Sequence, residues 1–266
     1  MKAFIIGKGG VGKSTISVGL ALAIKDKNPL LVSLDPAHNI SDILSGANKI
    51  NIEVKEPDFE KELSSYLKNL TETMKKEAFR YLTVFNMENL LDTLRYSPGT
   101  EEHMLLEVIK KNIDHENVIF DTPPTGLFMK VLGLLRSNII WLQKLIELRK
   151  EIINRKGIKK DAILDILKTK FSEYTELEQK IQNDAVFIGV STPEPLSLRE
   201  TERIIGFLKT EGYALPFIIV NRTKISGPIF KNLKHVFIPS YIGTPFEIAE
   251  KASIIIKKNL KEWVTF

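Results

Sequence analysis

The feature that most constrains the fold is a glycine-rich loop at residues 7–15, directly after a short apolar run. The loop fits the pattern G-x-x-x-x-G-K-[ST], and a helical pattern begins at Lys13 and continues to Ile24. Glycines let successive backbone N–H groups turn inward around a phosphate, and the start of the following helix adds positive potential. The segment therefore predicts a strand, a phosphate-binding turn and a helix.

The residue types of this loop match the parts that a triphosphate site needs. Lys13 is placed to reach the β- and γ-phosphates, and the hydroxyl of Ser14 is a ligand for Mg²⁺. The alternative is a glycine-rich turn without a ligand, and both the strand before the loop and the amphipathic helix after it argue against that reading. The nucleotide-binding residues that we expect in the loop are Gly9, Gly10, Val11, Gly12, Lys13, Ser14 and Thr15.

Short apolar runs and helical patterns alternate along the chain. Runs rich in Ile, Val and Phe, too short for helices, lie at 3–6, 30–34, 118–120, 185–190, 217–220 and 236–238. Helical patterns lie between them, for example at 13–24, 196–208 and 245–263. Strands that alternate with helices predict an α/β fold with a mostly parallel, doubly wound sheet, here with the loop of a P-loop nucleotide hydrolase.

Two intervals, at about 57–113 and 127–181, are too long for simple crossovers and have helical spacing throughout. In the second interval one apolar face is widened by neighbouring apolar residues, and the positions concerned are Val131, Leu134, Leu135, Ile139, Ile140, Trp141, Leu142, Leu145 and Ile146. We therefore predict one domain over residues 1–266, in which both intervals form a helical subdomain inserted into the α/β core.

Phosphoryl transfer also requires a carboxylate near Mg²⁺ and a group that positions the attacking water. Asp121 follows the run 118–120 and so stands at the carboxyl end of a buried strand, where open α/β sheets bind ligands. Asp35 follows the run 30–34 in the same way and opens the segment Asp-Pro-Ala-His-Asn-Ile-Ser-Asp. Each aspartate has an alternative role as a helix N-cap or a turn residue.

Composition excludes several classes of site. The chain has no cysteine, which rules out disulfides, thiolate zinc sites and cysteine-bound iron–sulfur clusters. The net charge of +5 permits contact with nucleic acid or an anionic membrane, but the basic residues are spread along the chain, so we expect no nucleic-acid partner. Without a signal-peptide pattern or an apolar run of eighteen residues, we expect a soluble, cytoplasmic protein.

Several segments together resemble the ArsA-type family of deviant P-loop ATPases. They are Lys8 in the loop, residues 35–42 resembling switch I, Asp-Thr-Pro-Pro-Thr-Gly at 121–126 resembling switch II, Leu198 with Glu-Thr-Glu-Arg at 200–203, and Asn221 after a strand. The family contains the arsenical pump-driving ATPase and the ATPase that targets tail-anchored membrane proteins. The resemblance covers about residues 1–260 and identifies the chain as a compact, cysteine-free member.

The resemblance implies a role for each remaining candidate. Lys8 would be the signature lysine that approaches the phosphates across a two-fold dimer face, which is the work of an arginine finger. Asp35 would orient or deprotonate the water, and Asp121 would hold Mg²⁺ through water together with Ser14. Asn221 would read the adenine edge, with the turn at Pro239 closing over the base. Asn221 has an alternative role as a strand-end cap.

The chain also departs from the family pattern. The targeting ATPase usually binds zinc through a cysteine pair at the dimer interface, and the arsenite pump senses metalloid through thiols, but this chain has no cysteine for either purpose. Family switch II normally reads Asp-Thr-Ala-Pro-Thr-Gly-His, whereas this chain has Pro123 and Leu127 at the Ala and His positions. A stiffer loop without that polar contact would change how hydrolysis is communicated to the helices.

The function that the resemblance implies is a Mg²⁺-dependent ATPase that works as a homodimeric switch through its nucleotide face. It would bind and release a hydrophobic or protein client, for example an apolar segment of a membrane protein. Met74, Met87, Met104 and Met129 lie in or beside the two helical intervals, and flexible thioethers suit promiscuous apolar binding. Methionines at helical spacing are also common in ordinary cores, so both readings stay open.

Two alternatives to the client switch remain. A positioning ATPase like MinD or ParA would act at a membrane or nucleoid, and the segment 245–266 is a candidate amphipathic helix for that purpose, although packing on the sheet also explains its pattern. A nucleotide-binding module without turnover is the non-enzyme alternative. Lys13, Asp35 and Asp121 argue against it because all the parts for hydrolysis are present.

Overall fold

The computed structural model describes residues 1–35, 39–46, 50–66, 68, 99–156, 161–224, 227, 229–230 and 233–260. Residues 36–38 of the switch I-like segment, Met74, Met87 and Trp263 lie outside the described residues. The chain forms two compact units. The first comprises residues 1–57, 111–129 and 181–266, and the second comprises residues 58–110 and 130–180.

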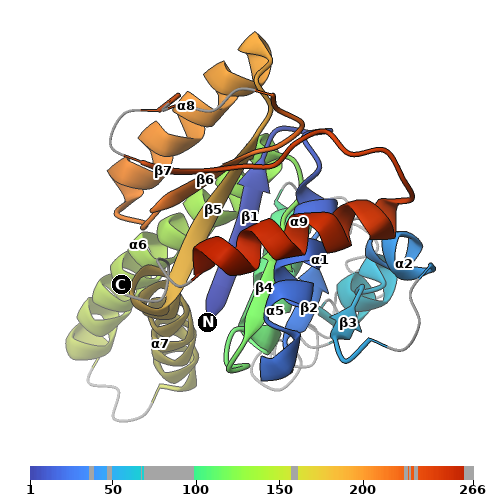
Figure 1. Ribbon diagram of the computed structural model, residues 1–266. Helices are drawn as coiled ribbons and strands as arrows, with labels where there is room; N and C mark the ends of the chain where they lie inside the picture. Colours follow the sequence, from blue (N-terminus) through green and yellow to red (C-terminus); the bar gives the residue numbers. More distant parts are fainter. Residues whose placement is uncertain are drawn as a thin grey trace. The chain divides into compact units, whose positions relative to one another are not determined.

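A parallel sheet of seven strands is the centre of the first unit (Figure 1). Its strands are β1 (Lys2–Gly7), β2 (Leu30–Ser33), β3 (Glu53–Lys55), β4 (Val118–Asp121), β5 (Ala185–Ser191), β6 (Phe217–Val220) and β7 (Lys234–Phe237). The strand order is β3-β2-β4-β1-β5-β6-β7, and every pair of neighbours is parallel. The predicted α/β fold with a doubly wound sheet is therefore confirmed, and the strands that the apolar runs predicted are present.

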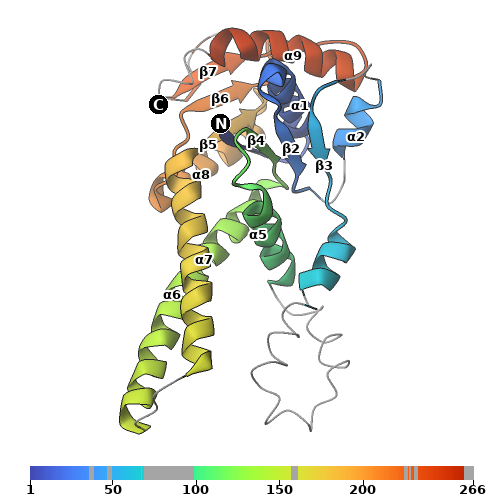
Figure 2. The ribbon, with the colours of Figure 1, turned by 90° about the horizontal axis from the view of Figure 1, so that it is seen from below.

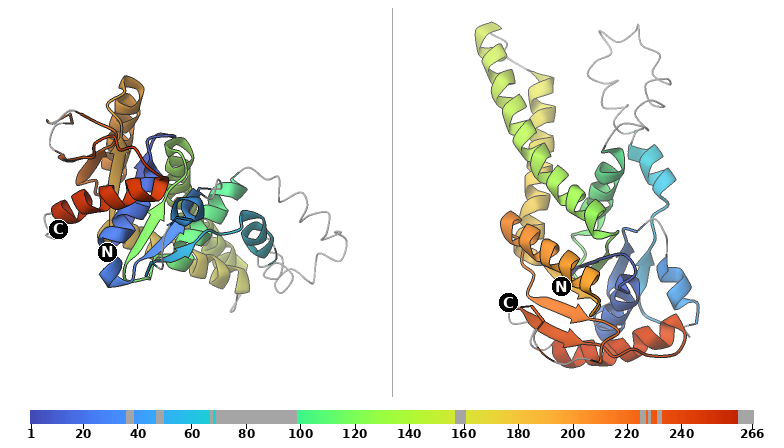
Figure 3. Two further views of the ribbon diagram at one scale, coloured as in Figure 1. Left: turned by 45° about the vertical axis from the view of Figure 1, so that its right-hand side comes forward. Right: turned by 90° about the horizontal axis from the view of Figure 1, so that it is seen from above.

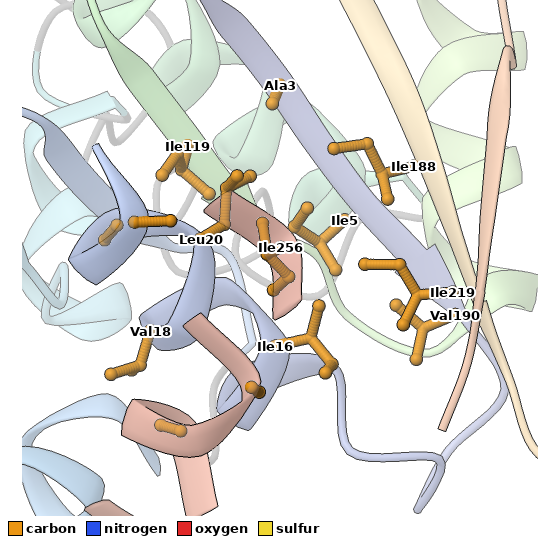
Figure 4. Close-up of a cluster of buried hydrophobic side chains, with 14 of the residues drawn as sticks. Ala3, Ile5, Ile16, Val18, Leu20, Ile119, Ile188, Val190, Ile219 and Ile256 are labelled. Atoms are coloured by element: carbon orange, nitrogen blue, oxygen red, sulfur yellow. The ribbon is translucent and has the colours of Figure 1, made fainter. Parts of the chain in front are cut away.

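One face of the sheet is covered by α1 (Lys13–Ala23), α2 (Asn39–Leu44) and α9 (Pro245–Leu260). Buried Ile and Val side chains of the strands, including Ile5, Ile119 and Ile188, form one cluster with Ile16 and Leu20 of α1 (Figure 4). α9 lies against α1 through small residues, so that a Cβ at Gly19 would come within 3.4 Å of the Cβ of Ala252. This close approach fixes the helix that begins at the glycine loop.

The opposite face of the sheet carries aromatic residues. Phe4 of β1 is in register with Phe120 of β4 and with Phe187 of β5. Its ring stacks on both, with centroids 4.7 Å from Phe120 and 5.1 Å from Phe187. Further along this face, α8 (Pro195–Glu211) packs Leu198 and Ile205 against the cluster that contains Ile218 of β6. Because both faces are covered, the central strands read as continuous apolar runs.

Besides the short 3-10 helix at Lys25–Lys27, two elements of the first unit were not predicted from the sequence. β3 has only three residues, Glu-Val-Lys, and lies at the edge of the sheet, so it shows no apolar run. α2 has six residues, which is too short for a helical period to stand out. Sheet pairing and packing determine both elements, and neither leaves a clear sequence pattern.

The described residues of the second unit are helical. Residues 59–66 form a helix that starts after Asp58, whose carboxylate accepts a hydrogen bond from the Lys61 N–H. Three longer helices lie mostly in this unit: α5 (Thr100–Asn112), α6 (Thr125–Lys156) and α7 (Ala162–Asp184). α6 and α7 run side by side in opposite directions (Figure 2 and Figure 3). Lys110 of α5 forms ion pairs with Glu107 at 3.0 Å and with Glu173 of α7 at 3.1 Å.

The apolar surface of α6 is divided along its length. Val131, Leu132 and Leu135 are buried near its start, whereas five large apolar side chains further along are exposed: Ile140, Trp141, Leu145, Leu148 and Ile152. We call these five residues the α6 stripe. Within the described residues, the helical segment Thr125–Arg155 is also long and apolar enough to cross a membrane by length and composition alone. α6 begins a few residues after β4 and runs beside α7 (Figure 2).

Candidate functional site

The loops that follow the strands gather at one edge of the sheet. Because all the strands are parallel, their carboxyl ends meet at that edge, where α/β sheets bind ligands. The loop at 8–12 follows β1, Asp35 follows β2, Asp121 ends β4 and Asn221 follows β6. The predicted site residues of these four strands therefore stand on a single edge of the first unit.

The loop after β1 depends on the backbone freedom of glycine, as the predicted phosphate-binding turn requires. Gly10 and Gly12 have φ values of 82° and 92°, in the left-handed region that side-chain-bearing residues rarely adopt. Gly12 is the N-cap of α1, so the loop delivers the chain directly into the helix. Gly9 and Gly10 are exposed, Lys8, Gly12, Ser14 and Thr15 are partly buried, and Val11 and Lys13 are buried.

Lys13 lies inside this edge and is only 7% exposed. Its Nζ is 3.4 Å from the carbonyl oxygen of Lys8. Burial lowers the pKa of the Lys13 ammonium from its usual value, while the negative charges of Asp121, Asp35 and Glu200 oppose that shift. Burial therefore outweighs the three carboxylates in its effect on the pKa of Lys13.

Asp121 is the most deeply buried carboxylate of the site, at 1% exposed. Its Oδ1 accepts a hydrogen bond of 2.9 Å from the Ser17 hydroxyl, and the Ser14 hydroxyl lies close enough to lower the pKa of this carboxylate. Burial raises the pKa of Asp121 to about 6, although the two serines and Lys13 act in the opposite direction. The carboxylate thus carries a charge that its surroundings only partly compensate.

This arrangement fits a divalent cation. The Ser14 hydroxyl and the Asp121 carboxylate are adjacent oxygen donors, which is the ligand type that Mg²⁺ prefers. A dication beside Asp121 would compensate the buried charge that now raises its pKa. With Ser14 as a direct ligand and Asp121 acting through water, the ion would take its remaining ligands from phosphate and water.

The loop after β4 is held firmly behind Asp121. The Thr122 hydroxyl donates a hydrogen bond of 2.7 Å to the carbonyl oxygen of Ile5, in the neighbouring strand β1. Pro123 is buried, and Thr125 begins α6. Leu127, at the position of the family histidine, is half-buried in the first turn of α6. The segment therefore connects the central strand pair directly to a helix that continues into the second unit.

Asp35 and Lys8 occupy more open positions. Asp35 is half-buried just beyond β2, where its N–H donates to the Ser33 hydroxyl at 3.3 Å. Its charge acts on both Lys13 and Asp121, which places it in the same electrostatic environment. Lys8 is half-buried at the start of the loop. Their catalytic roles stay predictions.

Asn221 lies against the loop. It is 5% exposed, and its Nδ2 donates a hydrogen bond of 2.9 Å to the carbonyl oxygen of Val11. Its Oδ1 accepts from the N–H of Arg222 at 3.0 Å. Pro239 is exposed two residues beyond β7. Adenine recognition by Asn221 and Pro239 stays a prediction.

Ser17 and Arg222 were not predicted from the sequence as site residues. Ser17 stands one helical turn after Lys13, a spacing that puts it on the same helix face, but only the fold reveals that this face meets Asp121. Arg222 follows Asn221 directly and has a positive φ of 55°. Its position next to a predicted site residue was the available signal.

Comparison with known proteins agrees with the resemblance seen in the motifs. The family model described as anion-transporting ATPase matches residues 1–229. The chain is 31% identical to the putative arsenical pump-driving ATPase 2 of Aquifex aeolicus over 252 residues, which cover 87% of this chain and 83% of that protein.

Eukaryotic relatives match over a similar range. The chain is 31% identical to the ATPase ASNA1 homolog of Entamoeba dispar, covering 82% of this chain and 75% of that protein. It is 29% identical to the ATPase GET3 of Chaetomium globosum, covering 85% and 73%. Because the family model matches most of the chain and relatives of about 30% identity are ATPases by name, the protein belongs to the ArsA-type, anion-transporting ATPase family and is an ATPase.

Proposed function

We propose that this ATPase is a Mg²⁺-dependent, dimeric switch whose nucleotide state controls the binding of an apolar client. The observation that carries the nucleotide part is the convergence of Lys13, Ser14 and Asp121 behind the glycine loop. The observation that supports the client part is the α6 stripe.

The residues divide the catalytic work as follows. Backbone N–H groups of the loop and the Lys13 ammonium bind the phosphates, and Lys13 neutralises the charge that develops on the transferred group. Ser14 and Asp121 hold Mg²⁺, which shields the phosphate oxygens when it is bound. Asp35 orients the attacking water and accepts its proton. Lys8 adds a second cation from the partner subunit.

The role of Asp35 is tested by Asp35→Asn. We expect this variant to bind ATP with little change in affinity and to lose roughly 100-fold or more in turnover, because the amide cannot accept a proton. Asp26→Asn is the matched control, since Asp26 lies in the short 3-10 helix after α1 and is exposed. Full turnover by Asp35→Asn would contradict the proposed role.

The dimeric switch is tested by sedimentation of Asp35→Asn with ATP and with ADP. We expect a dimer with ATP and a monomer or a looser dimer with ADP. Adding Lys8→Ala should weaken the ATP-bound dimer, whereas Lys8→Arg should preserve it because the charge remains. A dimer that survives Lys8→Ala would contradict the role of Lys8 in assembly, and unchanged turnover in the single Lys8→Ala variant would contradict its catalytic role.

The α6 stripe is suited to an apolar helix. Trp141, Leu145, Leu148 and Ile152 follow one another at intervals of four, three and four residues, so they lie on one face of α6. From Ile140 to Ile152 the stripe extends about 18 Å at 1.5 Å per residue. Trp141 is 65% exposed, and large apolar side chains in such a row are characteristic of protein-binding surfaces. We therefore infer that the client is an apolar helical segment of a membrane protein.

Client binding is tested with a synthetic apolar helix and the fluorescence of Trp141 in a Trp263→Phe background. We expect the fluorescence emission of Trp141 to shift to the blue when the peptide binds. The peptide affinity should differ between the ATP-bound and the ADP-bound protein. Leu145→Gln with Leu148→Gln should reduce peptide affinity roughly tenfold while turnover stays unchanged, because these variants remove apolar contact area. Ile254→Gln is the control, since Ile254 is an exposed apolar residue on α9, outside the α6 stripe. Equal loss in the control would argue against a specific stripe.

The positioning-ATPase alternative receives less support from α9. Ala249, Ala252 and Ile256 of α9 are buried in the cluster shared with α1, so its apolar face is already covered by protein. We propose a cytoplasmic location because the inferred client would have to be bound before it enters a membrane. Vesicle flotation of the ATP-bound protein, without client, distinguishes the alternatives: binding to anionic vesicles would favour the positioning ATPase.

A further inference from the structure

The chain makes a rigid corner where it leaves β6. The N–H of Asn221 donates to the carbonyl oxygen of Ser191 at 2.8 Å, and the N–H of Thr223 donates to the carbonyl oxygen of Ile238 at 3.1 Å. Arg222, between them, has a φ of 55°, an unusual value for a residue with a side chain. The two backbone hydrogen bonds, on either side of Arg222, hold it in this conformation. The corner is therefore fixed relative to the sheet.

Side chains from this corner hold two successive carbonyl groups of the glycine loop. Asn221 Nδ2 donates to the carbonyl oxygen of Val11 at 2.9 Å in a buried position. Arg222 Nη1 makes a longer contact of 3.4 Å with the carbonyl oxygen of Gly10. The N–H of Arg222 donates to Asn221 Oδ1 at 3.0 Å, which fixes the orientation of the amide.

Holding those carbonyls also orients the loop N–H groups. The chain has no cis peptide bonds among the described residues, and in a planar trans peptide the N–H points opposite to the carbonyl. When the carbonyls of Gly10 and Val11 point at the corner, the N–H groups of Val11 and Gly12 point away from it. These are N–H groups of the phosphate cradle.

The fit between the corner and the loop is close at Gly12. A Cβ built on Gly12 would come within 2.6 Å of Asn221 Nδ2, so the amide occupies the space that any side chain would need. Position 12 therefore requires glycine for two reasons, its left-handed backbone and the close approach of the Asn221 amide. A loop that moved away from the corner would lose a buried hydrogen bond and expose this contact.

We propose that Asn221, supported by Arg222, is a positioning residue of the phosphate site, which presets the loop for phosphate whatever base is attached. The inference deepens the proposed function and rests on it, since it takes the glycine loop as the phosphate site. It is compatible with adenine recognition, because after these bonds the Asn221 amide still has one N–H and one oxygen lone pair. It adds a phosphate-directed role to a residue whose sequence context suggested only the base.

The test compares two ligands, ATP and inorganic tripolyphosphate, which has no base. Calorimetric titration of Asn221→Ala at constant Mg²⁺ should show a loss of roughly five- to thirtyfold in affinity for tripolyphosphate, because the carbonyl of Val11 loses its buried partner and the loop is no longer preset. The loss for ATP should be at least as large. Unchanged affinity for tripolyphosphate with weaker ATP binding would overturn the proposal and leave Asn221 as a base reader only.

A second readout needs no ligand. Hydrogen exchange of the loop segment 8–13 should become faster in the ligand-free Asn221→Asp variant, which keeps the acceptor for the Arg222 N–H but places an oxygen against the carbonyl of Val11. Arg222→Asn, which tolerates the same backbone conformation, should give a smaller increase. Unchanged exchange in Asn221→Asp would overturn the proposal even if the alanine variant folds poorly.

Two controls separate the outcomes. Asn259→Ala removes a similar amide-to-carbonyl bond, from Asn259 Nδ2 to Ile255 at 2.8 Å on α9, and should change neither exchange in the loop nor tripolyphosphate binding. Lys13→Ala should weaken tripolyphosphate binding strongly. If Lys13→Ala has no effect, the phosphate site itself is misplaced and the proposed function fails. If only Lys13→Ala has an effect, the site stands and the role of Asn221 is wrong.

Discussion

Asp121 and Lys13 are buried charged residues at the candidate nucleotide site. Asp121 is nearly inaccessible, yet two serine hydroxyls and Lys13 stabilise its charge only in part, and burial raises its pKa to about 6. Buried charges with shifted pKa values are common at functional sites. The same carboxylate that costs stability is the one proposed to hold Mg²⁺.

Asp121→Asn should therefore raise the stability of the folded protein and lower its turnover. At pH 7.5 the neutral amide removes the cost of burying a charge. We therefore expect the free energy of unfolding of the ligand-free protein to rise by roughly 1–2 kcal/mol, which raises the thermal midpoint by a few degrees. Mg²⁺-dependent turnover should fall by roughly 100-fold or more. Calorimetric melting and a phosphate-release assay measure the two effects, and a lower midpoint would show that the carboxylate makes a net stabilising contribution.

His235 of β7 is predicted to make stability sensitive to mild acid. Its ring stacks with the rings of Phe230 and Phe237, and its Nε2 accepts a hydrogen bond of 3.0 Å from the Phe230 N–H, which requires a neutral ring. Burial lowers the pKa of His235, opposed by a hydrogen bond to the Leu233 backbone. As the pH falls, His235 is therefore protonated in the unfolded chain before it is protonated in the folded protein. Its contribution to the free energy of unfolding is complete above about pH 6.5 and is lost as the pH falls below that value.

Urea unfolding at pH 7.5 and pH 5.5 tests that sign. The wild-type protein should lose more stability between the two values than His235→Gln, whose side chain accepts a hydrogen bond without titrating. The difference between the two proteins isolates His235 from other titrating groups. An equal loss in both would mean that His235 is not the group responsible.

At the scale of elements, the α6–α7 hairpin depends on a polar link at its far end. Arg149 of α6 donates to both carboxylate oxygens of Asp161, through Nε at 3.0 Å and Nη2 at 2.7 Å. Asp161 also caps α7, because its Oδ1 accepts from the Leu164 N–H at 2.8 Å. One carboxylate thus ends the connection between the helices and starts the second helix.

Arg149→Gln should loosen the hairpin locally. We expect faster hydrogen exchange in the last turns of α6 and the first turn of α7, with turnover unchanged, because the planar two-bond contact is lost. Arg155→Gln on the same helix is the control, since Arg155 is exposed and its carboxylate partner Glu151 is 4.0 Å away. If both variants gave the same exchange pattern, the link through Asp161 would not be what holds the hairpin.

At the scale of the whole molecule, ligand binding and folding are linked through the first unit. The residues of the proposed nucleotide site follow or end β1, β2, β4, β6 and β7. A nucleotide that binds only the folded state must therefore stabilise the first unit. Residues 111–129 connect this unit to the second one, beginning with the end of α5 and continuing through Asp121 into α6.

ADP with Mg²⁺ at about 100 times its dissociation constant should therefore stabilise the wild-type protein by about 2.7 kcal/mol. Lys13→Ala should lose that gain at the same ligand concentration, because its affinity is lower. Thermal melting with and without ligand makes the comparison, and hydrogen exchange shows which segments are protected. Protection confined to the second unit would contradict the location of the site.

Much of the fold was predictable because parallel strands buried on both faces leave continuous apolar runs. Phe4, Phe120 and Phe187 belong to such runs, and all three strands were predicted. β3 and α2 were not, since a three-residue edge strand and a six-residue helix have too few residues for a period. The division of α6 into a buried start and an exposed stripe was also beyond the pattern, because both parts have the same helical spacing.

The sequence by itself determined the glycine loop, its lysine and serine, and the strand-end positions of Asp35, Asp121 and Asn221. Local spacing is enough for these, because a turn that wraps phosphate needs its residues in consecutive order. Only the tertiary structure decided which groups meet across the sheet edge: Ser17 with Asp121, and Asn221 with Val11. Those partners are 104 and 210 residues apart in the chain, and strand order, which no local pattern records, brings them together.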